Sequence, residues 1–323
     1  METTVYLYDA KGTDKQIDLK DVEPTKIREN HLLWIDVQER NEKAIQQVID
    51  VLELQNVPLK SILDVSERPK IEIFDGFYRF FIVLVKIVEE KKIEKTPIDF
   101  IIGKNFIVSI HKGEVDYFRE FHERENGETQ IGELDAESFV STLLDLHIVS
   151  YFRVLEEIEK KVDQLDEKVL KTDLEDREFL SEMVVLRRNI SDLRRWFLPH
   201  RDVFYALARP DFMQISQSDS AENFRMLIQH FENAVESIES SRDTVLSVFD
   251  LYATKSAQKM NVFIQRLTFL TLIVGSMSVI AGILGMNYKV DFFDHPSGFW
   301  ITIGSMILIA ASLAIVAKRK RWI

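Results

Sequence analysis

Polar and small side chains recur along one face of an apolar segment near the C-terminus of this 323-residue chain. The amide of Asn261 and the hydroxyls of Thr271 and Ser278 carry oxygen atoms that accept hydrogen bonds from water around a cation. Glycines on the same face leave room for water or for a neighbouring helix. The spacing alternates between three and four residues, which is a heptad pattern: Asn261, Ile264, Thr268, Thr271, Gly275, Ser278 and Gly282.

This stripe has two interpretations. Small residues let membrane helices approach closely, so the stripe fits a packing seam. A water-lined conduit formed where identical helices converge needs the same residue types at the same spacing. The stripe alone does not separate packing from conduction.

Two long uncharged runs position the stripe. Leu267–Met286 has 20 residues without a charge, and Phe299–Ala317 has 19. A helix needs about 20 apolar residues to cross the hydrocarbon core of a bilayer, and helices of globular proteins seldom avoid charge for so long. We therefore expect a transmembrane hairpin in the lipid bilayer, with the stripe on its first helix.

The charges around these runs predict their orientation, because basic residues collect on the cytoplasmic side. The loop 287–298 has one lysine, Lys289, against Asp291 and Asp294. The other basic residues lie before the first run and after the second: Lys255, Lys259, Arg266, Lys318, Arg319, Lys320 and Arg321. We expect a multi-pass protein of the cell inner (plasma) membrane with both termini in the cytoplasm.

The remaining composition excludes several classes of function. A net charge of −12 lacks the basic surface that nucleic-acid binding requires. Without cysteine there is no disulfide, thiolate metal site or cysteine nucleophile. No His-Glu-x-x-His, phosphate-binding loop or Gly-x-Ser-x-Gly motif occurs, so we expect no enzyme. The N-terminus lacks the basic start and apolar core of a signal peptide, and we expect none.

The first 132 residues predict a cytoplasmic α/β domain. Strands are predicted at residues 4–10 and 31–38, and two β-rich runs flank Asp75-Gly76, a strong hairpin signal. A second hairpin is predicted over residues 98–111. Helical periodicity predicts helices at 41–55 and 58–67.

The pattern then becomes helical, so the expected fold class is α+β. Residues 133–220 predict an acidic helical hairpin with helices at 133–172 and 176–197, and residues 221–266 predict a long stalk helix. The stalk enters the membrane segment 267–323 without a break signal. At 1.5 Å per residue it gives about 100 Å of helix to Met286. Motion of the cytoplasmic domain would reach the membrane helix directly.

Gly285-Met286-Asn287 ends the first apolar run, before a short loop and a second run with a basic end. In this place the tripeptide is the signature of the CorA Mg²⁺ transporter family, which the chain resembles over its whole length. Arg68-Pro69-Lys70 and the stretch Pro296–Trp300 are also similar to that family.

The resemblance implies a funnel-shaped homopentamer whose first membrane helices surround a central pore. It places a hydrated Mg²⁺ against the selectivity filter Gly285, Met286 and Asn287. Mg²⁺ releases its water reluctantly, so neutral amides and hydroxyls suit it, whereas carboxylates would bind too tightly for release. The resemblance also implies the pore-lining residues, with Ile264 and Leu267 at a hydrophobic gate: Asn261, Ile264, Leu267, Thr271, Gly275 and Ser278.

Asn287 lies five residues past Gly282 and therefore off the stripe, so a regular helix would not point its side chain into the pore. The helix is therefore expected to end or unwind near Gly285, which glycine permits at little steric cost. The alternative is that Asn287 only caps the helix C-terminus.

Family members also hold an inhibitory Mg²⁺ site between subunits, with paired acids after the first hairpin strand and an aspartate on the stalk. Here Asp75 precedes Gly76, and Met226 occupies the stalk position, so the place of this site is open. Asp75 is one candidate regulatory ligand, although it also fits a simple turn residue. Four other acids are also candidate regulatory ligands, although each fits a solvated charge better: Asp163, Asp166, Asp243 and Asp250.

The expected function is Mg²⁺ influx down the electrochemical gradient, gated by cytoplasmic Mg²⁺, with Mg²⁺ as both cargo and regulator. The alternatives are a Co²⁺, Ni²⁺ or Zn²⁺ transporter of the same family, as in ZntB-type proteins, and a membrane-anchored sensor that transports nothing. The lack of a Cys or His cluster favours Mg²⁺. The sequence leaves open the preferred ion, the resting state, and channel or carrier behaviour.

Overall fold

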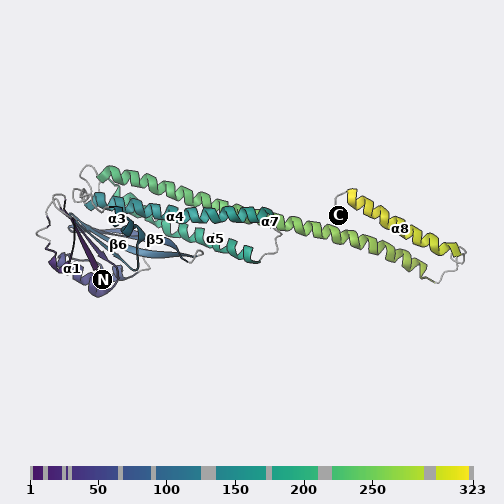
Figure 1. Ribbon diagram of the computed structural model, residues 1–323, viewed down its shortest axis with the longest axis horizontal. Helices are drawn as coiled ribbons and strands as arrows, with labels where there is room; N and C mark the ends of the chain where they lie inside the picture. Colours follow the sequence, from purple (N-terminus) through teal and green to yellow (C-terminus); the bar gives the residue numbers. More distant parts are fainter. Residues whose placement is uncertain are drawn as a thin grey trace. The chain divides into compact units, whose positions relative to one another are not determined.

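The computed structural model describes residues 3–9, 14–23, 27, 31–64, 68–88, 92–124, 136–171, 177–209, 220–286 and 296–319. The chain divides into two compact units, Met1–Val248 and Phe249–Ile323. The first unit contains a β-sheet covered by helices (Figure 1). The finer division expected at residues 132, 220 and 266 stays a prediction.

Within the described residues, the sheet of the first unit has seven strands. They are β1 (Thr3–Asp9), β2 (Lys15–Ile17), β3 (His31–Val37), β4 (Lys70–Phe74), β5 (Phe77–Val88), β6 (Lys92–Gly103) and β7 (Phe106–His111). Their order in space is β2-β1-β3-β7-β6-β5-β4. Only the central pair β3 and β7 runs parallel. Both predicted hairpins and the strands predicted at 4–10 and 31–38 are confirmed.

Glycines fix the turns of the two predicted hairpins. Asp75-Gly76 joins β4 to β5, and Gly76 has a φ of +77°, which residues with a side chain rarely adopt. Between β6 and β7, a Cβ on Gly103 would lie 2.1 Å from the ring of Phe106. Neither position accepts a side chain without local rearrangement.

Several elements were not predicted from the sequence. Strand β6 begins at Lys92, because the 12 residues of β5 pair with it from Val88↔Lys92 to Phe77↔Gly103. This pairing makes a strand of a charged segment that has no strand pattern of its own. The short helices α3 (Asp116–Arg124) and α6 (Arg201–Leu207) were also not predicted, since so few residues give little periodicity.

Helices cover both faces of the sheet (Figure 1). On one face, α1 (Glu42–Val51) and α2 (Leu59–Leu63) close an aliphatic core that includes Ile45 and Val48. On the other face lie α3 and α4 (Ala136–Lys171). There the ring of the fully buried Trp34 lies 5.0 Å from that of Phe118 and 5.4 Å from that of Phe139. Successive side chains of β3 point alternately into the two cores, because side chains on a strand alternate between its faces.

The helical layer continues with α5 (Arg177–Phe197), the 3₁₀ turn η4 (Leu198–His200), α6 and the first part of α7 (Ser220–Leu284). Ion pairs join the elements: Arg194 of α5 lies 2.5 Å from Glu239 of α7, and Arg201 of α6 lies 2.8 Å from Glu232. The helices predicted at 133–172, at 176–197 and from residue 221 are confirmed. The inward face of α7 consists of buried apolar residues: Phe224, Leu227, Phe231, Ala234 and Ile238. Burial of each phenylalanine side chain contributes about 1.5–3 kcal/mol to the stability of the fold.

The second unit contains the end of α7 and α8 (Pro296–Arg319). Three helices in the described part of the chain are long and apolar enough to cross a membrane. In Ala136–Val169 the most apolar window is 61% buried inside the first unit, whereas the windows of α7 and α8 are 0% buried. The exposed apolar surface of α7 and α8 therefore lies on the two segments that the sequence predicts to span the bilayer.

Candidate functional site

The seven residues of the stripe all lie on α7, and each is exposed in the single chain. Leu267 is exposed too, but it precedes Thr268 by one residue and so lies beside the stripe, about 100° around the helix. Within the described part of the chain the stripe is thus an open helix face.

Two hydroxyls of the stripe donate inside their own helix. Thr271 Oγ1 donates to the carbonyl oxygen of Leu267 at 2.8 Å, and Ser278 Oγ donates to that of Val274 at 2.8 Å. A hydroxyl has one donor and two acceptor lone pairs, so each oxygen remains an acceptor. Apart from the neighbouring residues and the backbone of the same helix, no described heavy atom lies within 4 Å of the place where a Cβ on Gly275 or Gly282 would stand. The stripe therefore presents acceptors and open space, which suits a cation whose bound waters point their hydrogens outward.

Helix α7 ends at Leu284, next to the place where the sequence required it to end or unwind. The amide of Gly285 still donates to the carbonyl of Ala281 at 2.9 Å, and that of Met286 donates to Ile283 at 3.2 Å, which tightens the last turn. Gly285 does not have a positive φ. A Cβ there would stand 3.3 Å from the Ala281 carbonyl oxygen, so its missing side chain instead relieves a close approach to the backbone.

Asn287 lies outside the described residues, as do Asp291, Asp294 and the basic residues from Lys320 onward. Their places in the filter, the outer loop and the tail stay predictions.

The candidate regulatory acids are spread over three elements. Asp75 is exposed in the β4–β5 turn, and Asp163 and Asp166 lie three residues apart on α4. Asp243 and Asp250 are exposed seven residues apart on α7. Among the described residues, no three metal-binding side chains gather in one group. A single chain therefore does not assemble these acids into a closed site.

The three-and-four spacing of the stripe continues on α7 toward the N-terminus, beyond Asn261, the first residue of the stripe. Continuing its spacing of three and four residues toward the N-terminus gives a mostly polar series along the same helix. Among its residues is Glu236, seven residues before Asp243. The signal was present as a heptad pattern, but exposure along the whole series appears only in the structure: Gln229, Asn233, Glu236, Ser240, Asp243, Ser247, Asp250, Thr254 and Ala257.

A second polar cluster borders a hollow of about 1190 Å³ in the first unit, at the carboxyl ends of β3 and β7. Asp36 accepts from Ser109 Oγ at 2.5 Å and lies 3.0 Å from Nε2 of His111, while Trp34 donates to Ser109 at 2.9 Å. The sequence did not predict this cluster, because its members come from two strands about 75 residues apart.

Comparisons with known proteins agree with the fold. The family model described as CorA-like Mg²⁺ transporter protein matches residues 29–319. A cobalt/magnesium transport protein CorA from Thermotoga maritima is 27% identical over 285 residues, covering 87% of this chain and 80% of that protein. One of the same description from Methanocaldococcus jannaschii is 25% identical over 298 residues, covering 90% and 92%.

Among solved structures, the complete structure of the CorA magnesium transporter from Methanocaldococcus jannaschii superimposes with a TM-score of 0.84 at 22% identity. It covers 99% of this chain and 98% of that one. This likeness shows that the two chains share one fold, including the long helices.

Proposed function

Since this chain belongs to the CorA-like Mg²⁺ transporter family and is a divalent-cation transporter rather than an enzyme, we propose that it conducts hydrated Mg²⁺ into the cytoplasm. The observation that carries this proposal is the exposed stripe of α7. The polar groups of its seven residues from Asn261 to Gly282 are uncharged, and two of the hydroxyls keep their acceptor capacity.

The chemistry of Mg²⁺ supports this choice of cargo. Mg²⁺ holds its octahedral water shell tightly, and that shell donates hydrogen bonds outward. Thr271 and Ser278 accept such bonds without replacing the water. Carboxylates at these positions would bind the ion and slow its release.

The proposed assembly is a funnel-shaped homopentamer in the plasma membrane, with five copies of the stripe facing one axis and both termini in the cytoplasm. Support comes from the open face of α7, which no element of the described chain covers. The basic residues Lys255, Lys259, Arg266, Lys318 and Arg319 favour this orientation. A membrane potential of 100 mV then drives each Mg²⁺ inward with about 4.6 kcal/mol.

The proposed gate responds to cytoplasmic Mg²⁺ through the acidic residues in the part of the polar series that lies N-terminal to the stripe on α7. In a homopentamer Glu236, Asp243 and Asp250 would each be present five times around the axis. Like charges so placed repel, and Mg²⁺ entering the funnel would screen them and favour closure. Asp75, Asp163 and Asp166 are further candidates. Because Met226 is exposed and uncharged at the stalk position, inhibition should need more Mg²⁺ than in relatives that keep an aspartate there.

Co²⁺ is the alternative cargo, since two relatives of this chain are described as cobalt/magnesium transport proteins. The stripe offers only oxygen ligands, which suit Mg²⁺ better than the imidazole and thiolate ligands favoured by later transition metals. A comparison of ions in one assay separates the two cargoes.

The test is ion uptake by the purified chain in liposomes, with Mg²⁺, Co²⁺ and Zn²⁺ compared. We expect uptake to be greatest for Mg²⁺, and Asn287→Gly to abolish that preference while the oligomer stays assembled. Glycine caps a helix as well as asparagine but has no amide side chain. Asn287→Asp should bind cations more tightly and release them more slowly.

Two outcomes would contradict this account. Absence of any ion uptake would leave a membrane-anchored sensor. Unchanged Mg²⁺ preference in Asn287→Gly would remove Asn287 from the filter that Gly285 and Met286 are proposed to form with it.

A further inference from the structure

A pair of buried histidines joins the helical layer to the sheet in the first unit. His147 of α4 and His200 of η4 are both 0% exposed, and their ring centroids lie 5.1 Å apart. His200 Nε2 accepts the backbone N–H of Val83 at 2.9 Å, and the hydroxyl of Tyr151 donates to the Val83 carbonyl at 2.6 Å. The helical layer thus satisfies both backbone groups of one residue of β5.

Val83 needs these partners because of its place in the sheet. Strand β4 pairs with β5 only as far as Phe81, so the edge of β5 is unpaired beyond that residue. The N–H and C=O of a strand residue point to the same edge of the strand, and both groups of Val83 meet helical partners at this edge, so β6 on the other side does not pair them. Without His200 the N–H of Val83 would be a buried donor lacking an acceptor, which costs about 1–3 kcal/mol.

The hydrogen bonds of His200 fix its protonation state. Nδ1 lies 2.9 Å from the Phe197 carbonyl oxygen, to which it must donate, and Nε2 accepts from Val83 and so carries no proton. A proton on Nε2 would face the N–H of Val83 and break that bond. Burial lowers the pKa of His200 from 6.5 to about 4.

A positive charge on His147 would be stabilised even less than one on His200. Among the described residues, neither of its ring nitrogens has a hydrogen-bond partner. Burial lowers the pKa of His147 well below its usual value, and the neighbouring His200 lowers it further. The titratable groups that face the pair are the phenols of Tyr117 on α3 and Tyr151 on α4, at centroid distances of 6.1 and 5.4 Å from His147.

These phenols give the pair no countercharge, because burial raises the pKa of both Tyr117 and Tyr151. Tyr117 also lines a hollow of about 230 Å³ between β5 and α4. This hollow therefore borders a residue whose ring packs against that of His147.

We propose that His147 and His200 form an acid-sensitive latch, which holds the helical layer on β5 when neutral and releases it when protonated. The device belongs to the first unit and does not depend on the proposed cargo. Both groups bind protons better in the opened or unfolded chain than in the closed one. The stabilisation is therefore complete above pH 6.5 and is lost as the pH falls.

Histidine exchange on the intact protein tests the latch directly. Hydrogen–deuterium exchange at the imidazole carbon, followed by mass spectrometry of the full chain in detergent from pH 4 to 8, gives a midpoint for each histidine. We expect the midpoints of His147 and His200 to lie well below 6.5, the ordinary value for histidine, and amide exchange at Val83 to accelerate on acidification. Midpoints near 6.5 for both would overturn the latch.

Unfolding by urea gives the second readout. From pH 7.5 to 5, His200 alone should raise the unfolding equilibrium constant about 30-fold, as follows from a pKa of 6.5 in the unfolded chain and about 4 in the folded one. His147→Phe removes a titrating group without removing a hydrogen bond, so its pH dependence should be shallower. Equal pH dependence in His147→Phe and wild type would refute the latch, and if His147→Phe does not fold, the exchange midpoints decide.

Discussion

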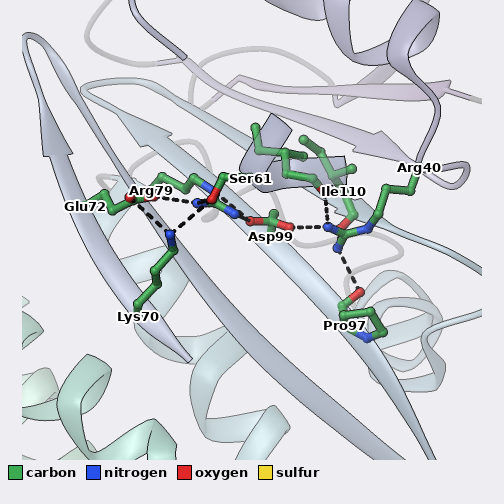
Figure 2. A network of polar contacts seen from close by, with 9 residues as sticks. Arg40, Ser61, Lys70, Glu72, Arg79, Pro97, Asp99 and Ile110 are labelled. Atoms are coloured by element: carbon green, nitrogen blue, oxygen red, sulfur yellow. Dashed lines mark hydrogen bonds and ion pairs between the residues drawn. The ribbon is translucent and has the colours of Figure 1, made fainter. Parts of the chain in front are cut away.

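Replacing Asp99 by asparagine should destabilise the first unit by about 3–5 kcal/mol. Asp99 of β6 is 0% exposed and accepts from Arg79 Nε at 2.7 Å and from Arg40 Nη1 (Figure 2). The side chains of Arg79 and Arg40 are only 1% and 3% exposed. Asparagine keeps the shape of the side chain but removes its charge, and it leaves two buried guanidinium groups without their shared carboxylate. Removing one partner of a buried charge pair is costly because the other stays desolvated.

Thermal unfolding of the purified full chain, followed by circular dichroism, measures this loss. A unit of this size loses about 2–4 °C per kcal/mol, so the midpoint should fall by roughly 6–20 °C. Glu72→Gln is the matched control: Glu72 contacts Arg79 and Lys70 in the same network but is 33% exposed, and its loss should cost no more than about 1 kcal/mol. Equal midpoints for Asp99→Asn and Glu72→Gln would show that burial does not set the strength of this network.

Two further predictions concern ion movement. Thr271→Val and Ser278→Ala remove hydroxyl acceptors with little change of shape, so Mg²⁺ uptake into liposomes should fall about tenfold per lost hydrogen bond; wild-type uptake in both variants would show that the stripe only packs helices. Asp243→Asn combined with Asp250→Asn removes the repulsion proposed to respond to cytoplasmic Mg²⁺, so uptake should lose its dependence on Mg²⁺ inside the liposome. Retained inhibition would place the sensing acids elsewhere.

The sequence was sufficient wherever structure depends on neighbours along the chain. The uncharged runs predicted the apolar parts of α7 and α8, and Asp75-Gly76 predicted the tight turn between β4 and β5. The heptad spacing predicted that Thr271, Gly275 and Ser278 share one helix face, and all three lie on α7 at that spacing. Each of these features follows from local periodicity or from the backbone freedom of a single glycine.

The signature tripeptide marks a limit of that reasoning. The sequence predicted that the helix ends near Gly285, and α7 ends at Leu284. Gly285 has no positive φ, and its missing side chain avoids a 3.3 Å approach to the Ala281 carbonyl oxygen, whereas the unwinding expected to aim Asn287 inward stays a prediction. An ending can be read from composition, whereas the backbone angles that produce it depend on contacts with the preceding turn.

Only the tertiary structure decided which distant side chains meet. Val83 and His200 are 117 residues apart in sequence, and Arg40 and Asp99 are 59 apart, yet each pair is joined by a hydrogen bond in the interior. No periodicity connects such pairs, because their contact depends on which faces of strands and helices pack together. A sequence pattern specifies the apolar face of each element, but the partner of a buried polar group is set by the whole fold, since only there is that group removed from water and obliged to find one.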